Sequence, residues 1–146
     1  MNKFFSSLPI FQSAGIAVVR IIVGLFLMFH GWEVFDKTKM LEYSNWELFK
    51  NSFSPLLLVY TGKAAELIAG FLLFFGLFTR VAAMIVIITF LYISFFVGHG
   101  KIWYDDQHPF LFVLLAIVFF VTGPGAASAD SLLFKRDGKK LKITDE

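Results

Sequence analysis

Two ionisable residues, Lys63 and Glu66, lie three positions apart inside an apolar run from Leu56 to Phe78. A charged group at the depth of a bilayer is costly in isolation, so such groups face a bundle interior, pair with each other or serve a function. The rise of a helix places Glu66 near the middle of this run. The pair therefore predicts a membrane protein with a polar interior that can hydrogen-bond or exchange protons with a ligand.

Other polar side chains gather toward the end of the apolar segments nearest Lys63. His30 follows the apolar flank Leu25–Phe29 and needs an internal hydrogen-bond partner, so it is either a core histidine or a ligand contact. Aromatic and polar residues at this end either line a polar mouth or anchor the chain at the membrane surface. The candidate ligand- or proton-binding residues are Arg20, His30, Tyr60, Lys63, Glu66 and His99.

The same residues give little support to a metal or covalent cofactor. No histidine pair has the close helical spacing of a metal motif, and His99 and His108 are poorly placed to oppose each other across a haem. The chain has no cysteine, which excludes disulfides, thiolate metal sites and iron–sulfur ligation. Any redox role must then use a bound cofactor or a partner.

The composition is that of an integral membrane protein. Apolar residues make up 58% of the 146 residues, charged residues only 16%, and the mean hydropathy is +0.74. The chain has room for one membrane domain over residues 1–146, in contact with the lipid bilayer. Its net charge of +2 is too small to indicate a nucleic-acid partner.

Apolar stretches predict an all-α bundle of four transmembrane helices, at about 14–35, 56–78, 81–97 and 109–122. Thr79 is the expected N-cap of the third helix, and Pro109 is a first-turn residue of the fourth. Between the first two spans, the segment Asp36–Pro55 is expected to form a short amphipathic helix on the outer membrane face. Asp130 is expected to cap a last short turn before the basic tail 135–146.

The distribution of Lys and Arg predicts the topology. Lys3, Arg20, Arg80 and the basic tail fall on one side, whereas acidic residues outnumber basic ones on the other. Cytoplasmic flanks retain positive charge, so both termini should be cytoplasmic. Arg20 interrupts the first apolar run and no small-residue cleavage site follows it closely, which favours an uncleaved anchor over a signal peptide.

Stripes of small residues indicate which helices pack together. Gly62, Glu66 and Gly70 recur at four-residue intervals, and Gly24 and Gly31 share a face with Arg20. If these faces meet, Arg20 can reach toward Glu66, with Lys63 competing for the same carboxylate. The alternative is that Arg20 and Lys63 extend to the two membrane surfaces and leave Glu66 protonated or bonded to backbone.

The motifs follow one another in a recognisable order. They are Arg20-x-x-x-Gly24 with His30-Gly31, Gly62-x-x-x-Glu66-x-x-x-Gly70, Gly76-Leu77-Phe78-Thr79-Arg80, and Gly123-x-Gly125-x-x-Ser128-x-Asp130. In this order they resemble the DoxX family of small bacterial and archaeal membrane proteins. His108-Pro109 is similar to the aromatic-Pro opening of that family's last helix, with His where Tyr is usual.

The resemblance implies a four-helix bundle in the bacterial inner (cytoplasmic) membrane and an association with membrane redox systems, including quinone-linked ones. It marks Arg20, His30, Glu66, Arg80 and Asp130 as candidate functional or structural residues. Our leading hypothesis is a redox-associated subunit that binds a quinone or similar lipophilic molecule between its helices. The alternative is a non-catalytic scaffolding subunit of a membrane complex, and transport is disfavoured because no broken helix is evident. We expect a membrane or membrane-associated protein as partner, and the chain could also form a homo-oligomer.

Overall fold

The computed structural model describes residues 11–50 and 52–134, and within these ranges the chain forms helices and no strands. Lys3 and the predicted basic tail 135–146 lie outside the described residues. The long helices are α1 (Gln12–Gly31), α4 (Pro55–Phe75), α5 (Thr79–Tyr92) and α6 (Gln107–Thr122). A 3₁₀ turn, η2 (Trp32–Phe35), continues α1, and a π-helical turn, η3 (Ile93–Val97), continues α5. The short helices are α2 (Lys37–Ser44), α3 (Glu47–Lys50) and α7 (Ala129–Leu133).

Three helical segments are long and apolar enough to cross a membrane: Gln12–Phe35, Pro55–Phe75 and Thr79–Val97. The helix α6 is equally apolar but has 16 residues, about 24 Å at 1.5 Å per residue, which is shorter than a typical hydrocarbon core. The chain is therefore a multi-pass membrane protein, and a crossing by α6 stays a prediction.

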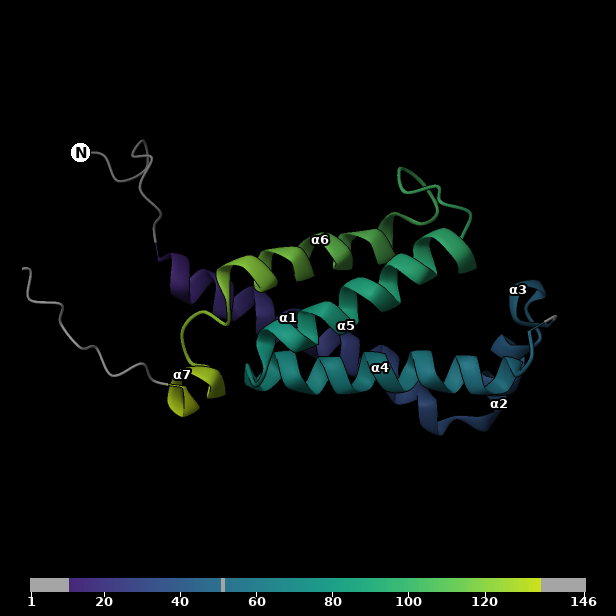
Figure 1. The fold of residues 1–146 in the computed structure, drawn as a ribbon, viewed down its shortest axis with the longest axis horizontal. Coiled ribbons are helices and arrows are strands. Elements are labelled where there is room, and N and C mark those ends of the chain that lie inside the picture. The colour runs from purple at the N-terminus through teal and green to yellow at the C-terminus, as the bar shows by residue number, and fades with distance from the viewer. Residues whose placement is uncertain (1–10, 51, 135–146) are drawn as a thin grey trace, which may run out of the picture.

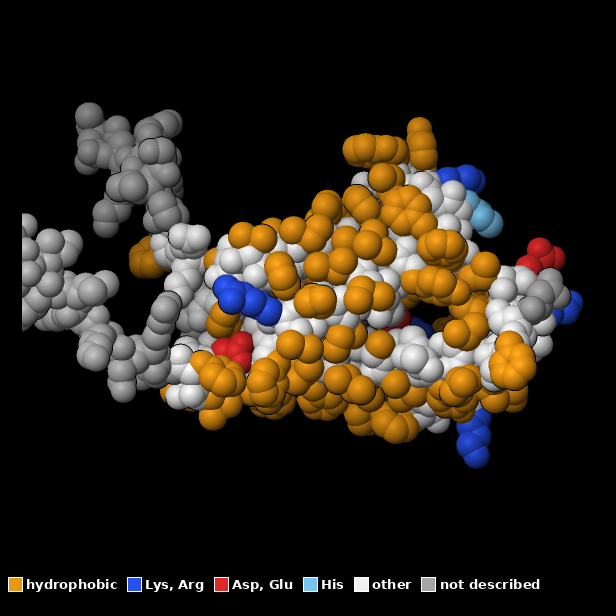
Figure 2. All heavy atoms as spheres, in the orientation of Figure 1, with side chains coloured by type: hydrophobic (Ala, Val, Ile, Leu, Met, Phe, Trp, Pro, Cys, Tyr) orange, Lys and Arg blue, Asp and Glu red, His pale blue; other side chains and the backbone are white. Residues whose placement is uncertain are grey.

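The long helices pack in the order α1, α4, α5, α6. Figure 1 shows α4 and α5 as a hairpin, with α1 behind and α6 along the outer side of α5. The start of α1 lies at the same end as α7, and α2 and α3 lie at the opposite end. Apolar side chains cover the face drawn in Figure 2, as expected for helices that meet lipid.

Glycines allow α1 and α4 to approach closely. A Cβ atom added to Gly24 would lie 2.6 Å from the backbone N of Phe74, and one added to Gly70 would lie 2.7 Å from that of Met28. A Cβ on Gly31 would lie 2.6 Å from the Cα of Leu67. These distances are shorter than any carbon can tolerate, so the two backbones touch only because the side chains are absent.

The end of α4 and the start of α5 differ from expectation. The helix α4 ends at Phe75, because Gly76 adopts a left-handed conformation with φ 64°. Thr79 does not cap α5, and its hydroxyl is buried without a hydrogen-bond partner in the described structure. Asp130 supplies the cap instead: its two carboxylate oxygens accept from the backbone N–H groups of Phe78 at 2.7 Å and Thr79 at 2.9 Å.

The cap of the last short helix and the helix between the first two spans also differ from the prediction. Ser128 rather than Asp130 caps α7, accepting from the N–H of Ser131 at 3.2 Å. The segment expected to form one amphipathic helix contains the two separate helices α2 and α3, and Asp36 caps α2 by accepting from the N–H groups of Thr38 and Lys39.

Candidate ligand-binding site

A cavity of about 670 Å³ lies between the long helices at the end of the bundle that carries α2 and α3. Figure 2 shows it as a hollow with acidic and basic atoms at its floor. Apolar side chains from α3, α4, α5 and η3 form most of its wall, among them Phe49, Val59, Phe90, Ile93 and Val97. Polar side chains in the lining include His30, Glu33, Tyr43, Thr61, Lys63, Glu66, Thr89 and His108.

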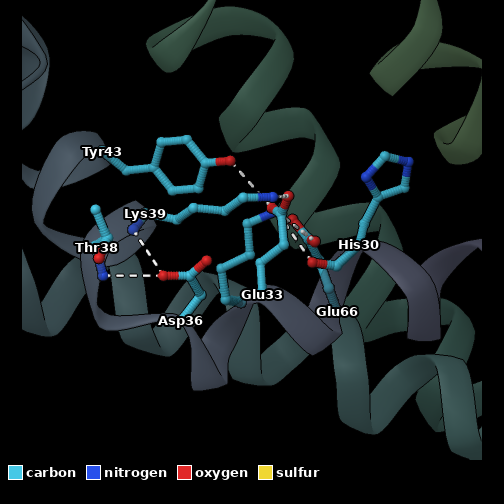
Figure 3. A network of polar contacts seen from close by, with 8 residues as sticks. His30, Glu33, Asp36, Thr38, Lys39, Tyr43 and Glu66 are labelled. Carbon is cyan, nitrogen blue, oxygen red and sulfur yellow. Dashed lines mark hydrogen bonds and ion pairs between the residues drawn. The ribbon is translucent and has the colours of Figure 1, made fainter.

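Lys63 is the centre of a polar network at the cavity wall (Figure 3). Its ammonium nitrogen lies 3.0 Å from a carboxylate oxygen of Glu66 and 3.1 Å from one of Glu33. It also lies 3.4 Å from the backbone oxygen of His30. The side chain of Glu66 is 5% exposed, so its charge is balanced by Lys63 rather than by water.

The helix α2 is tied to this network through Glu33. One carboxylate oxygen of Glu33 lies 2.6 Å from the ammonium of Lys39, and the other accepts from the hydroxyl of Tyr43 at 3.1 Å. The hydrogen bond to Glu33 raises the pKa of Lys39. Burial, followed by the hydrogen bond to Glu33, raises the pKa of Tyr43. Lys39 therefore stays charged and Tyr43 stays a hydrogen-bond donor at neutral pH, and both contacts persist.

Two histidine rings lie next to each other in the cavity wall. The ring of His30, at the end of α1, lies edge-on to the ring of His108, at the start of α6, with centroids 6.1 Å apart. His108 also contacts Phe112, with ring centroids 5.2 Å apart. Each imidazole carries two ring nitrogens that can donate or accept hydrogen bonds, so this pair adds hydrogen-bonding groups beside the lysine and the carboxylates.

The predicted approach of Arg20 to Glu66 is wrong. The guanidinium of Arg20 is fully buried at the opposite end of the bundle and donates to four backbone carbonyls. The acceptors are Pro124 at 2.8 Å, Phe74 at 3.0 Å, Ala127 at 3.1 Å and Leu73. Leu73 and Phe74 belong to the last turn of α4, where carbonyls have few helical partners, and the carbonyl of Leu73 also accepts from the backbone N–H of Gly76 at 3.1 Å. Arg20 is thus neither paired with Glu66 nor extended to a membrane surface, and the alternative that Lys63 extends to the surface is also wrong.

The remaining sequence-predicted residues are dispersed. Tyr60 lines a separate groove on α4, and His99 is exposed, with its backbone N–H donating to Asp106 at 2.9 Å. Arg80 is exposed and donates to the carbonyl of Phe120 at 3.3 Å. Gly62 lines the cavity, and a Cβ there would meet nothing within 4 Å, so it does not serve close helix packing.

Among the acidic residues and histidines that line the cavity, the candidates predicted from the sequence did not include Glu33 and His108. Glu33 follows His30 by three positions, which places both on one side of the α1 end, and this spacing was the available signal. His108 was noted at the start of the last helix, but only the folded chain brings it to His30.

The chemistry of the site is that of hydrogen bonding and proton transfer. Glu33, Glu66, Lys63 and Lys39 form a chain of alternating charges that sums to zero, beside apolar walls. Within residues 11–50 and 52–134, no three histidine or acidic side chains are grouped so that they could hold a metal ion.

Comparisons with known proteins agree with the motif resemblance. The model of the DoxX family matches residues 15–99. A Haemophilus influenzae protein described as uncharacterized is 30% identical over 145 residues, covering 93% of this chain and all of that protein. A Bacillus subtilis protein named "Putative oxidoreductase CatD" is 29% identical over 141 residues, covering 96% of each chain. No solved structure matches this chain at a significant level.

Proposed function

Because this chain belongs to the DoxX family, we propose that it is a membrane subunit of a redox system and binds a quinone or similar lipophilic molecule in the cavity beside Lys63. The observation that carries the proposal is the Lys63–Glu66 ion pair, which lies in the wall of a cavity that is otherwise mostly apolar. Small-molecule sites combine apolar walls with a few polar groups that fix orientation. The name of the Bacillus subtilis relative supports the redox association.

The lining suits a quinone because a quinone offers two carbonyl acceptors on a flat apolar ring. Lys63 and the histidine pair are donors that can reach such carbonyls, and Phe90 can pack against the ring. Reduction of a quinone to a quinol takes up two electrons and two protons. His30, His108 and Glu66 can relay protons, whereas the electrons come from a partner reductant, since the chain has no cysteine.

Binding of a quinone to protein in lipid nanodiscs tests the proposal. Replacing Lys63→Met together with Glu66→Gln removes both charges and leaves neither one buried alone, so folding is retained while the donor is lost. We expect quinone affinity to fall about tenfold or more, the cost of one charged hydrogen bond. Quenching of tryptophan fluorescence by the added quinone measures the affinity.

Lys101→Met is the matched control, because Lys101 pairs with exposed Asp105 at 3.6 Å and lies outside the cavity. The Lys101→Met variant should bind the quinone with the same affinity as the unmodified protein. Unchanged quinone affinity in the folded double variant would contradict the proposal.

The alternative is a scaffolding subunit in which buried charges only hold helices together. The contacts of Arg20 favour this role for that residue, since all its acceptors are backbone carbonyls. A scaffold predicts that the Lys63→Met, Glu66→Gln double variant changes the yield of a partner complex and that the protein binds no quinone.

A further inference from the structure

An apolar groove runs along the outer surface of α4 and α5, next to the cavity. Its volume is about 530 Å³. The lining residues are Tyr60, Thr61, Ala64, Ala65, Ile68 and Ile85. From Tyr60 to Ile68 the groove follows α4 for about 12 Å. Thr61 and Ile68 are exposed, so the groove faces the lipid.

The groove and the cavity share part of their walls. Thr61 and Ala65, one helical turn apart on α4, line both. Little side-chain volume separates the groove from the cavity at this point, because Ala65 contributes only a methyl group. The hydroxyl of Thr61 donates to the carbonyl of Leu57 at 2.7 Å, so its polar atom is already bonded within the helix. On the facing helix, Ile85 lines the groove and Ile88 lines the cavity one turn later.

The two spaces differ in chemistry. The cavity contains the ion pairs of Lys63 and the two histidines, whereas the groove offers hydrocarbon and only the hydroxyls of Tyr60 and Thr61. A ligand that occupies both must carry a polar head at one end and a hydrocarbon chain at the other.

We propose that the ligand of the cavity is such an amphiphile, with its polar ring beside Lys63 and its hydrocarbon tail crossing Ala65 into the α4–α5 groove. This inference rests on the proposed function and specifies its substrate class as a tailed lipid-soluble compound. The tail leaves the protein between α4 and α5, directly into the membrane.

The test compares a quinone that carries an isoprenoid tail with the same ring lacking the tail, each measured in nanodiscs. Ala64→Phe fills the groove without touching the cavity, since Ala64 lines only the groove. The affinity for the tailed quinone should fall about tenfold or more relative to the unmodified protein, and that for the tail-free quinone should stay within twofold. For each quinone, the affinity of the variant is compared with that of the unmodified protein, so the different membrane partitioning of the two quinones does not affect the result.

Two further variants keep the test decisive. Ile68→Trp fills the groove from an exposed position that a folded protein tolerates, and should act like Ala64→Phe. Ala14→Phe adds the same ring at an exposed position of α1 and should change neither affinity. Unchanged binding of the tailed quinone in folded groove variants, or an equal loss for both ligands, would overturn the inference. Failure of the unmodified protein to bind either quinone would instead refute the proposed function itself.

Discussion

Arg20 is the buried charge on which helix packing depends most directly. Its guanidinium is 0% exposed and joins the last turn of α4 to the segment between α6 and α7. The negative end of the α4 dipole, where the last carbonyls of the helix are exposed to the guanidinium, favours a cation at this place. Gly76 is part of the same arrangement, because a Cβ there would lie 2.6 Å from a guanidinium nitrogen.

Arg20→Lys should therefore destabilise the protein although it keeps the charge. A lysine ammonium has three donors and cannot reproduce the planar fork that reaches four carbonyls. We expect a loss of about 3 kcal/mol in the free energy of unfolding, measured by thermal or denaturant unfolding in detergent.

The matched control is Arg80→Lys, because Arg80 is exposed and makes one hydrogen bond, to Phe120. It should change stability by less than about 0.5 kcal/mol. Equal stability of the two variants would show that the four carbonyl contacts contribute nothing.

At the level of single residues, the sequence indicated the contact between Lys63 and Glu66 but not the acceptors of Arg20. An acid and a base three positions apart on a helix are neighbours whatever the tertiary structure, so this pair could be found locally. The acceptors of Arg20 are backbone carbonyls, which carry no sequence signature. Asp130 is a similar case, because its carboxylate caps a helix that begins 51 residues earlier in the chain.

Among the helices, the contact between α1 and α4 depends on glycine. The backbone of Gly24 touches that of Phe74, and the carbonyl of Gly70 lies 2.9 Å from where a Gly24 Cβ would be. Both atoms are main chain and cannot rotate away. The ion pairs of the cavity depend on this contact between the helices. Glu33 comes directly after α1, and its partner Lys63 lies on α4 together with Glu66.

Gly24→Ala should push α1 away from α4 and lower stability by about 1–3 kcal/mol, as for other overpacked contacts. Unfolding in detergent followed by circular dichroism measures the loss. Gly15→Ala, on the same helix but with nothing within 4 Å of the added Cβ, should be neutral or slightly stabilising because alanine favours helix. A Gly24→Ala variant as stable as Gly15→Ala would contradict the close packing.

The long helices themselves were predictable within a few residues. Hydropathy identifies helices that face lipid. Glycine often ends a helix, and Gly76 and Gly123 are the C-caps of α4 and α6. The helices between the first two spans were less predictable, because short polar segments are shaped by tertiary contacts such as those of Glu33 with Lys39 and Tyr43.

Across the whole molecule, the sequence predicted a ligand site between helices but not which side chains line it, since the lining comes from helices far apart in sequence. His30 and His108 are 78 positions apart in the sequence, yet their rings are in contact, and no local sequence pattern predicts this contact.

The absence of cysteine makes a clean test of the fourth crossing practicable. In Lys101→Cys the new thiol lies between η3 and α6, and in Leu132→Cys it lies on α7, where Leu132 is 82% exposed. If α6 crosses the membrane as predicted, a membrane-impermeant maleimide should label the two single-cysteine proteins from opposite sides of sealed vesicles. Labelling of both from the same side would show that α6 does not cross.

The contacts of Arg20 also bear on how the protein is made. Arg20 leaves the ribosome with α1, but its acceptor at Ala127 is synthesised 107 residues later. Until Pro124 and Ala127 have been synthesised, the guanidinium lacks two of its four acceptors, so we expect α1 to reach its final packing only after the last segment has been translated. Nascent chains that stop before Ala127 should consequently be recognised as incomplete and degraded by membrane proteases.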